Sequence, residues 1–297
     1  MLLSTCILPV ATGPAATRDA WRRAEGLGFH AAYTYDHLNW QESFRDGPWG
    51  DAWLTLATAA AVTSRIRLGT LVSTPNFHHP VMLAKDVVTL DGLSDGRVTL
   101  GLGAGTEEYD AAILGAPPLT PRRRADRFAE LVEQLDHLLT HDVSTLTGEW
   151  YSAVEARVLP RCVQRPRVPF AIAGGGPRGM RLAARYGQAW VTVGDDRIGR
   201  DGTVEETRAA IAAQTARLDA ACVEVGRDPA SLDRILLTGF TADAVHAVEP
   251  FLDAVSAYAA LGITEIVVHA PIAGTRFAMD EDAYEEIAAL GAEIAPL

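Results

Sequence analysis

Residues 65–105 read RIRLGTLVSTPNFHHPVMLAKDVVTLDGLSDGRVTLGLGAG and decide the fold. An apolar run over 66–72 ends at a polar corner, and a second apolar run from Val98 ends in alternate glycines. Between the two runs, a segment that opens at Pro80 carries apolar residues at helical spacing. The stretch therefore predicts a strand, a helix and a second strand. Its nearly continuous apolar runs are typical of parallel strands that are covered on both faces.

The same alternation continues along the chain. Apolar runs that predict strands occur at 3–8, 30–35, 66–72, 98–105, 169–173, 189–193, 235–240 and 265–269. Helical patterns lie between them, and no change of composition marks a linker. Eight strands alternating with helices predict an α/β fold, a (β/α)8 TIM barrel with insertions at its C-terminal mouth, in which residues 1–297 form a single domain. Residues 142–167 carry mixed polar and proline signals and predict a long irregular connection.

Composition argues against several classes of partner. The chain has 297 residues and a formal net charge of -12, so nucleic acid and anionic membranes would repel it. Its three cysteines have no metal-ligand or redox spacing. No stretch reaches the length of a membrane span, and the apolar first residues are interrupted by Pro9 without a basic segment before them. We therefore expect a first strand rather than a signal peptide, and a cytoplasmic protein.

A glycine corner, Gly174-Gly175-Gly176-Pro177, joins a predicted strand to a predicted helix. The glycines allow close approach to the backbone, and Pro177 suits a first helical turn, where its missing N–H is not needed. Free amides in such a turn form an anion site that suits a phosphate, but a tight turn explains the same residues equally well. Barrels usually hold phosphate after strands seven and eight, whereas this corner follows strand five.

Asp36-His37 closes the second predicted strand at the C-terminal rim. A histidine there could carry a proton near neutral pH, and a structural role is equally consistent with its position. Because adjacent residues of a strand point to opposite faces, Asp36 is not automatically the partner of His37. The adjacent pair His78-His79 lacks metal-ligand spacing, so no metal site is expected.

Charged clusters follow the fourth predicted strand. Glu107, Glu108 and Asp110 form an acidic patch, and Arg122-Arg123-Arg124 occupies the first turn of a predicted helix. Cations are unfavourable at that end of the helix dipole. Together with Arg178, which follows the glycine corner, these arginines are expected to be solvated surface charges. The alternative is that they attract a polyanionic ligand toward the mouth.

Three motifs occur together in a fixed order. Strand two ends in YDH, RIRLGTLVSTPNFHHP leads to LDGLSDGRVTLGLGAG, and VPFAIAGGGPRGMRLAARYGQAW follows. With these motifs the chain resembles the bacterial luciferase-like superfamily, and within it the branch that uses the deazaflavin coenzyme F420. The resemblance implies a barrel that holds the flavin ring at its C-terminal mouth. It also implies a bulge in strand three that supports the ring, often with a non-prolyl cis peptide, here at Leu71–Val72.

The resemblance further implies roles for individual residues. Asp36 and His37 would lie at the edge of the deazaflavin, with His37 near the reacting carbon, and the glycine corner would hold the phosphate. The residues expected to line or flank the ring are Leu71, Val72, Thr74, Gly103, Gly105, Thr106 and Tyr109. The family's sugar-phosphate dehydrogenases carry an acidic proton donor where this chain has Thr106. The identity of the acid therefore stays open, and Glu108 is the candidate.

Three functions fit these implications. The first is an F420-dependent oxidoreductase that passes hydride between the deazaflavin and a small organic substrate, while His37, helped by Glu108, handles the proton. The second is an FMN-dependent monooxygenase on the same scaffold, and the third is a flavin-binding relative without catalysis. The family favours homodimers. An apolar or aromatic-lined pocket is expected from the loops at 38–50 and 142–167, with Trp40, Trp49, Trp150 and Tyr151.

Overall fold

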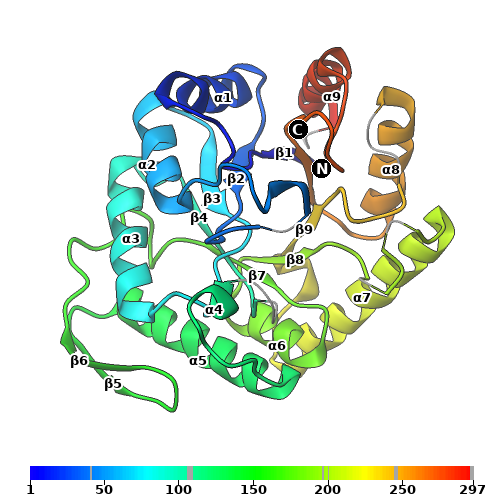
Figure 1. The fold of residues 1–297 in the computed structure, drawn as a ribbon. Coiled ribbons are helices and arrows are strands. Elements are labelled where there is room, and N and C mark those ends of the chain that lie inside the picture. The colour runs from blue at the N-terminus through cyan, green and yellow to red at the C-terminus, as the bar shows by residue number, and fades with distance from the viewer. Residues whose placement is uncertain (41, 106–109, 196, 200, 244–246, 295–297) are drawn as a thin grey trace.

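Eight parallel strands close into a barrel in the computed structural model, which describes residues 1–40, 42–105, 110–195, 197–199, 201–243 and 247–294 (Figure 1). The strands are β1 (Leu2–Cys6), β2 (Ala31–Thr34), β3 (Arg67–Thr70), β4 (Val98–Leu102), β7 (Phe170–Ala173), β8 (Ala189–Thr192), β9 (Asp233–Leu237) and β10 (Glu265–His269). Their order around the barrel is β1-β10-β9-β8-β7-β4-β3-β2, so strands that follow one another along the chain lie side by side. Each overlaps a strand that the sequence predicts, and the predicted (β/α)8 fold is confirmed.

Helices surround the barrel (Figure 1). They are α1 (Pro14–Gly26), α2 (Ala52–Val62), α3 (Pro80–Leu93), α5 (Pro121–Thr140), α6 (Pro177–Tyr186), α7 (Val204–Glu224), α8 (Val248–Ala260) and α9 (Glu281–Ile294), with the short elements η1 (Glu42–Phe44), α4 (Asp110–Ile113) and η2 (Pro229–Ser231). Several begin at a side-chain cap: Asp51 accepts the amide of Leu54, and Thr120 accepts that of Arg123. Within the described ranges, no helix is long and apolar enough to cross a membrane.

Two apolar cores hold the barrel and its helices together. The larger core lies between the strands and the helices and includes Leu68 and Leu100. The smaller core fills the barrel itself and includes Tyr33 and Val267. Alternate residues of a strand face one core or the other, as the pleat requires. Burial on both faces explains why the strands are nearly continuous apolar runs in the sequence.

Glycine allows β3 and β4 to approach each other closely. A Cβ at Gly101 would lie 1.9 Å from the carbonyl oxygen of Thr70, and a Cβ at Gly69 would lie 2.2 Å from that of Thr99. Atoms cannot approach that closely without displacing the backbone, so a larger residue does not fit at either position. Glycine at these positions therefore allows close pairing of the two strands whose loops carry much of the predicted site.

The connection at 142–167 contains a hairpin that the sequence analysis did not predict. Its strands β5 (Ser144–Thr147) and β6 (Ser152–Ala156) pair in antiparallel fashion outside the ring of helices (Figure 1). The carboxylate of Glu130, on α5, accepts hydrogen bonds from the amides of Trp150 and Tyr151 beside the turn. The residue that holds the turn thus lies on another element, which explains why the local pattern predicted an irregular connection.

The sequence predicts that the connection at 142–167 helps to line the mouth, and the structure corrects this prediction. The connection leads from α5 to β7, and Gln164 and Arg167 near its end line a cavity at the N-terminal ends of the strands. Trp150 and Tyr151 pack with the outer core, and the Tyr151 hydroxyl donates to the carbonyl of Pro75 at 3.4 Å. These two aromatic residues therefore do not pack with the cluster inside the barrel, whereas Trp40 does and Trp49 packs against it.

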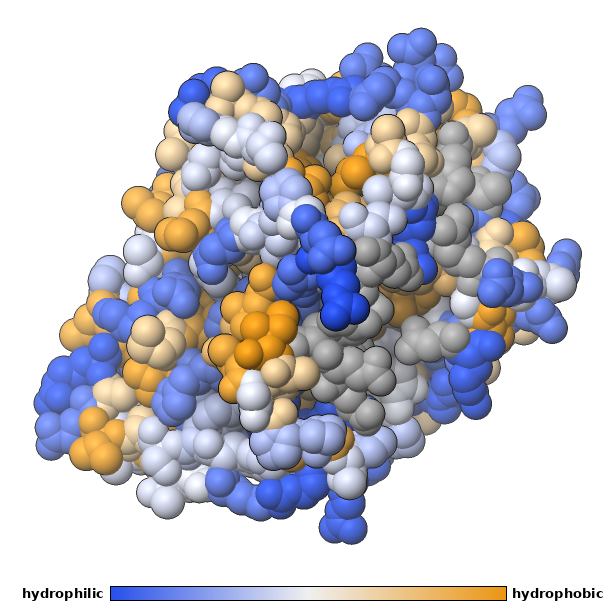
Figure 2. All heavy atoms as spheres, in the orientation of Figure 1, coloured by the Kyte–Doolittle hydropathy of each residue, from blue (hydrophilic) through white to orange (hydrophobic). Residues whose placement is uncertain are grey.

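The face seen in Figure 2 carries an apolar patch over α4. In this region Ile113 and Leu114 are 57% and 60% exposed. Because α4 follows β4 in the chain, it lies beyond the C-terminal ends of the strands, over the barrel opening in Figure 1. The patch therefore borders the end of the barrel at which the sequence predicts the functional site.

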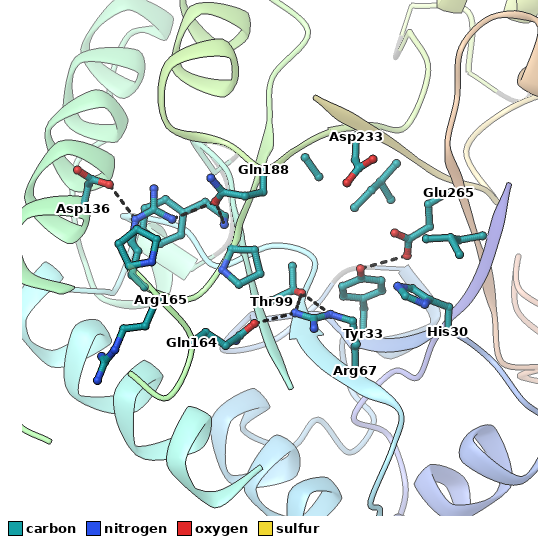
Figure 3. A pocket seen from close by; sticks show the side chains of 17 residues that line it. His30, Tyr33, Arg67, Thr99, Asp136, Gln164, Arg165, Gln188, Asp233 and Glu265 are labelled. Atoms are coloured by element: carbon teal, nitrogen blue, oxygen red, sulfur yellow. Dashed lines mark hydrogen bonds and ion pairs between the residues drawn. The ribbon is translucent and has the colours of Figure 1, made fainter. Parts of the chain in front are cut away.

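A cavity of about 450 Å³ lies at the opposite, N-terminal end of the barrel (Figure 3). In Figure 3, Glu265 and Tyr33 point toward one another, and the Tyr33 hydroxyl donates to the Glu265 carboxylate at 3.1 Å. The guanidinium of Arg67 donates to the hydroxyl of Thr99 and to the side-chain oxygen of Gln164. Because these polar groups bind one another, we interpret this end as part of the framework, as is usual for the N-terminal face of a barrel.

Glu265 is the buried acid of this cavity and is 6% exposed. Burial raises the pKa of its carboxyl to about 7 from an ordinary value of 4.5, although hydrogen bonds from Ser4 and Tyr33 oppose the rise. Between these two values the native state holds a proton that unfolding releases. The free energy of unfolding therefore falls as the pH rises through this window.

We expect Glu265→Gln to remove this pH dependence, because the amide stays neutral and can still accept the Tyr33 hydroxyl. From about pH 5 to about pH 8, the wild type should lose up to about 3 kcal/mol of unfolding free energy relative to the variant. Denaturant unfolding at both pH values measures this difference. Glu249→Gln, at an exposed position of α8, is the control. The same pH dependence in both variants would contradict the assignment to Glu265.

Candidate functional site

Four predicted segments meet at the C-terminal rim of the barrel. Asp36-His37 follows β2, residues 71–74 follow β3, residues 103–105 follow β4, and the glycine corner follows β7. They lie at the same end because the strands that carry them are parallel. Four further residues with predicted roles or in the acidic patch lie outside the described residues: Thr106, Glu107, Glu108 and Tyr109.

His37 is held by a buried carboxylate. Its Nδ1 lies 2.8 Å from Oδ2 of Asp110, and Oδ1 of Asp110 accepts the amide of Leu38 at 2.8 Å. Asp110, the first residue of α4, is 1% exposed, whereas the His37 side chain is 18% exposed. The indole of Trp49 donates to the His37 carbonyl at 2.9 Å. In the described part of the chain no hydrogen bond engages Nε2, so this ring nitrogen can meet a ligand.

Asp110 is the functional candidate that the sequence reasoning missed. The acidic patch after the fourth strand was the signal that could have indicated it. That signal does not say which acid faces the barrel or which histidine it reaches. The pairing joins the segment after β2 to α4, which follows β4, so it exists only once β2, β3 and β4 lie side by side.

Asp36 makes a different set of contacts. Its Oδ2 accepts the indole N–H of Trp53 at 3.1 Å, lies 2.7 Å from Nε2 of His78, and accepts the hydroxyl of Ser73. Asp36 is 2% exposed, and its carboxylate ties the end of β2 to α2 and to the loop after β3. Asp36 and His37 therefore have separate partners, although both lie beyond the end of β2, and the contacts of Asp36 belong to the framework of the rim.

His78 and His79 take part in the framework as well. His78 contacts Asp36, and Nδ1 of His79 accepts the amide of Val81 at 3.2 Å where α3 begins. Across the ranges that the structure describes, no group of three or more His, Cys, Asp or Glu side chains could hold a metal ion. Both histidines thus have a structural explanation.

The end of β3 packs tightly against the end of β4. The Leu71–Val72 peptide bond is cis, as the resemblance implies. A Cβ at Gly103 would lie 2.5 Å from Cγ2 of Val72, so a side chain there would collide with it. Leu71 and Thr74 are buried, whereas Val72 is half-buried. Of the three residues of this turn that were expected to line a ring, Val72 is the one that is accessible at the rim.

Gly105 connects the packing between the ends of β3 and β4 with α5. Its φ of +74° is a conformation that favours glycine, and a Cβ there would lie 2.5 Å from Nδ2 of Asn76. The side-chain oxygen of Asn76 accepts a hydrogen bond from Arg127, on α5, at 2.5 Å. The loops after β3 and β4 are thereby linked to the helix beside the glycine corner.

An aromatic cluster occupies the side of the mouth above β1, β2 and β10. We call it the mouth cluster and define it as Tyr35, Trp40, Phe44, His269 and Phe277. The Tyr35 hydroxyl lies 2.8 Å from Nε2 of His269, and the His269 ring stacks on Phe277 with 3.8 Å between centroids. Trp40 stacks on Phe277 in turn. The aromatic lining predicted from the loop at 38–50 is present, packed largely against itself.

The glycine corner borders a cavity of about 290 Å³ on the side of β4 and β7. Gly174 packs closely, since a Cβ there would lie 2.8 Å from Cα of Gly179. Gly176 is the N-cap of α6 and supplies no side-chain cap, and among the described residues a Cβ at Gly176 would meet no atom within 4 Å. The corner therefore combines a tight strand-to-helix contact with an open helix start that suits an anion.

Arginines near the corner form ion pairs. Arg178, in the first turn of α6, binds Asp126 on α5. Arg123 binds Glu149, and its guanidinium lies 4.3 Å from the centroid of the Trp150 ring. Both pairs are substantially exposed, so they contribute little stability. The expected surface charges are thus partly neutralised by neighbouring acids.

Comparison with known proteins identifies the family. The luciferase-like monooxygenase family matches residues 3–291. A 4-hydroxyprotoasukamycin monooxygenase from Streptomyces nodosus subsp. asukaensis is 38% identical over 179 residues, which cover 59% of this chain and 47% of that protein. An F420-dependent glucose-6-phosphate dehydrogenase from Beutenbergia cavernae is 34% identical over 243 residues, which cover 81% of this chain and 68% of that protein. The match thus spans about half of the first relative and two thirds of the second.

A solved structure shares the fold over nearly the whole chain. The coenzyme F420-dependent tetrahydromethanopterin reductase from Methanopyrus kandleri has a TM-score of 0.74 and 18% identity, with 99% of both chains covered. At that identity the likeness is one of fold. The family match and the F420-dependent glucose-6-phosphate dehydrogenase confirm the resemblance that the sequence motifs indicated. The chain therefore belongs to the luciferase-like monooxygenase family.

Proposed function

We propose that the protein is an F420-dependent oxidoreductase that transfers hydride between the deazaflavin and a small organic substrate. The observation that carries this proposal is the His37–Asp110 pair, at the strand end where the resemblance expects the reacting carbon. The 34% identity to an F420-dependent glucose-6-phosphate dehydrogenase supports the choice of coenzyme. The substrate of that relative is not carried over, because Thr106 stands where the family's sugar-phosphate dehydrogenases have an acid.

The glycine corner fits the phosphate of such a coenzyme. A Cβ built at Gly175 would find no protein atom closer than 3.9 Å, and one at Gly176 would find none within 4 Å. Helix α6 begins there with Pro177 in its first turn and without a side-chain cap. Its first amides and its dipole therefore remain available to an anion. We infer that residues 174–177 would hold the phosphate.

The ring is proposed to lie at the rim beside Val72 and Gly103. Val72 is half-buried, and Gly103 keeps the backbone after β4 close to it. Beneath this surface, Leu71 and Thr74 are buried and would support it from behind. Asp36 would hold the turn in place through Ser73. The remaining residues proposed to flank the ring are Gly105, Thr106 and Tyr109.

His37 would handle the proton. When bound, F420 supplies a ring carbon that gives or receives hydride. Nδ1 of His37 is engaged by Asp110, so Nε2 remains to exchange a proton with the substrate atom whose charge changes. A well-placed general acid or base contributes roughly a hundredfold to ten-thousandfold in rate. Glu108 is proposed as a second proton carrier on the basis of the resemblance.

The mouth cluster favours an apolar or aromatic substrate. The ring of Tyr35 lies 6.2 Å from that of His37, and the ring of Trp40 lies 6.5 Å from it. A substrate that reaches Nε2 would therefore contact aromatic surface. The homodimer that the resemblance implies stays a prediction.

A second candidate is an FMN-dependent monooxygenase on the same site. The 38% identity to a 4-hydroxyprotoasukamycin monooxygenase favours it, and the glycine corner would serve the phosphate of FMN equally well. A flavin-binding relative without catalysis is the third. Fluorescence and oxygen-uptake measurements with each reduced coenzyme separate them. Tight F420 binding without oxygen uptake supports the first. Oxygen consumption with reduced FMN that yields an oxygenated substrate, beyond the oxidation of free FMN, supports the second, and binding without turnover of a substrate panel supports the third.

We expect His37→Ala to slow hydride transfer by about a hundredfold or more, because it removes the proton carrier. Stopped-flow absorbance of the coenzyme measures the rate. His141→Ala, at an exposed position just after α5, is the control and should leave the rate unchanged. An unaltered rate in His37→Ala would remove this histidine from the mechanism.

We expect Gly176→Asp to weaken coenzyme binding by roughly tenfold or more, because the new carboxylate would cap α6 and repel a phosphate there. Its free energy of unfolding should stay equal or rise by a few tenths of a kcal/mol. Ala247→Asp adds the same cap to α8, which also begins without one, and should leave binding unaltered. Fluorescence titration compares the two variants. Equal affinities would place the phosphate elsewhere.

A further inference from the structure

We propose that Asp110 is a positioning residue that sets the tautomer of His37. The inference rests on the proposed function, in which His37 exchanges a proton at the rim. Nothing in the sequence pattern pairs these two residues, which stand 73 positions apart. The pairing follows from the contact between Oδ2 of Asp110 and Nδ1 of His37 at 2.8 Å.

The two oxygens of Asp110 have separate partners. Oδ1 faces the backbone N–H of Leu38 at 2.8 Å, and that group can only donate. Oδ2 faces the ring of His37. A carboxylate accepts hydrogen bonds at both oxygens, so the ring must present a donor at Nδ1. The neutral imidazole then carries its proton on Nδ1 and leaves Nε2 as an acceptor.

The contacts around His37 disfavour another orientation or hydrogen-bonding pattern of its ring. Asp110 is 1% exposed, so solvent does not compete readily for its oxygens. The amide of Leu38 and the indole of Trp49, which donates to the His37 carbonyl, fix the backbone on which the ring stands. Nε2 therefore starts each cycle ready to accept a proton, and the positive charge that results lies beside a carboxylate.

A purely structural role for Asp110 would have different consequences. As a tie between two loops, Asp110 would need only hydrogen-bond partners of the right shape, and asparagine could supply them. Asp36 is the internal comparison, because it is equally buried and ties loops together through Trp53 and His78 without a hydrogen bond to His37. The tautomer of His37 is the property that separates the two roles.

Asp110→Asn tests the inference. The amide of Leu38 still requires an acceptor, so the side-chain oxygen of the asparagine is retained there and its NH2 group faces Nδ1 of His37. The ring must then accept at Nδ1 and carry its proton on Nε2. Nitrogen-15 NMR of the histidine rings in the coenzyme-free protein measures the tautomer of His37 directly. The signals of His37 are assigned as those that are missing from the spectrum of the His37→Gln variant.

We expect the Nδ1–H tautomer in the wild type and in Asp36→Asn, and the Nε2–H tautomer in Asp110→Asn. Hydride transfer in Asp110→Asn should be slower by about a hundredfold or more, with KM changed far less than kcat. An Nε2–H tautomer in the wild type overturns the inference without any variant. So does an unchanged tautomer in a folded Asp110→Asn, or a reversed tautomer with an unchanged rate. Failure of both coenzymes to bind would instead overturn the proposed function, while the tautomer measurement would still decide the position of the proton.

Discussion

Closure of a parallel barrel is the constraint on which the other features depend. Each strand pairs with a neighbour on both sides, from β1 through β10 and round again to β2. All the carboxyl ends must then meet at one rim, and loops that are distant in sequence become neighbours there. The approach of β3 to β4 at Gly69 and Gly101 belongs to the same closure, because side chains at these positions would separate the strands. The contact between His37 and Asp110 depends on this arrangement, because it needs β2, β3 and β4 side by side.

The strands and the glycine corner could be predicted because their causes are local. A strand that is buried on both faces must be apolar throughout, and glycine and proline limit the backbone wherever they stand. The hairpin within 142–167 could not be predicted in this way, since the amides of its turn are bound by Glu130 on α5. The partner of His37 could not be predicted for the same reason. Several acids follow the fourth strand, and only the folded structure shows that Asp110 is the one that contacts His37.

Three buried acids show how neighbours decide what a carboxylate does. Asp36 receives hydrogen bonds from side chains of α2 and of the loop after β3, and so becomes part of the framework. Asp110 receives one backbone amide and one imidazole, which connects it to a group at the rim. Glu265, at the other end of the barrel, has the Tyr33 hydroxyl as donor, and burial raises its pKa. The exposed fraction of each acid alone would not distinguish these roles.

Helix α6 starts at a glycine N-cap without a side-chain cap, so the fold lacks a contribution that a capping side chain would supply, a few tenths of a kcal/mol relative to glycine. An anion seated on those amides restores it and, by mass action, raises the melting temperature in proportion to the logarithm of its concentration. The amides that would recognise the ligand are also those that stabilise the helix. A coenzyme phosphate bound there as proposed would then also slow the proteolysis of each copy of the protein.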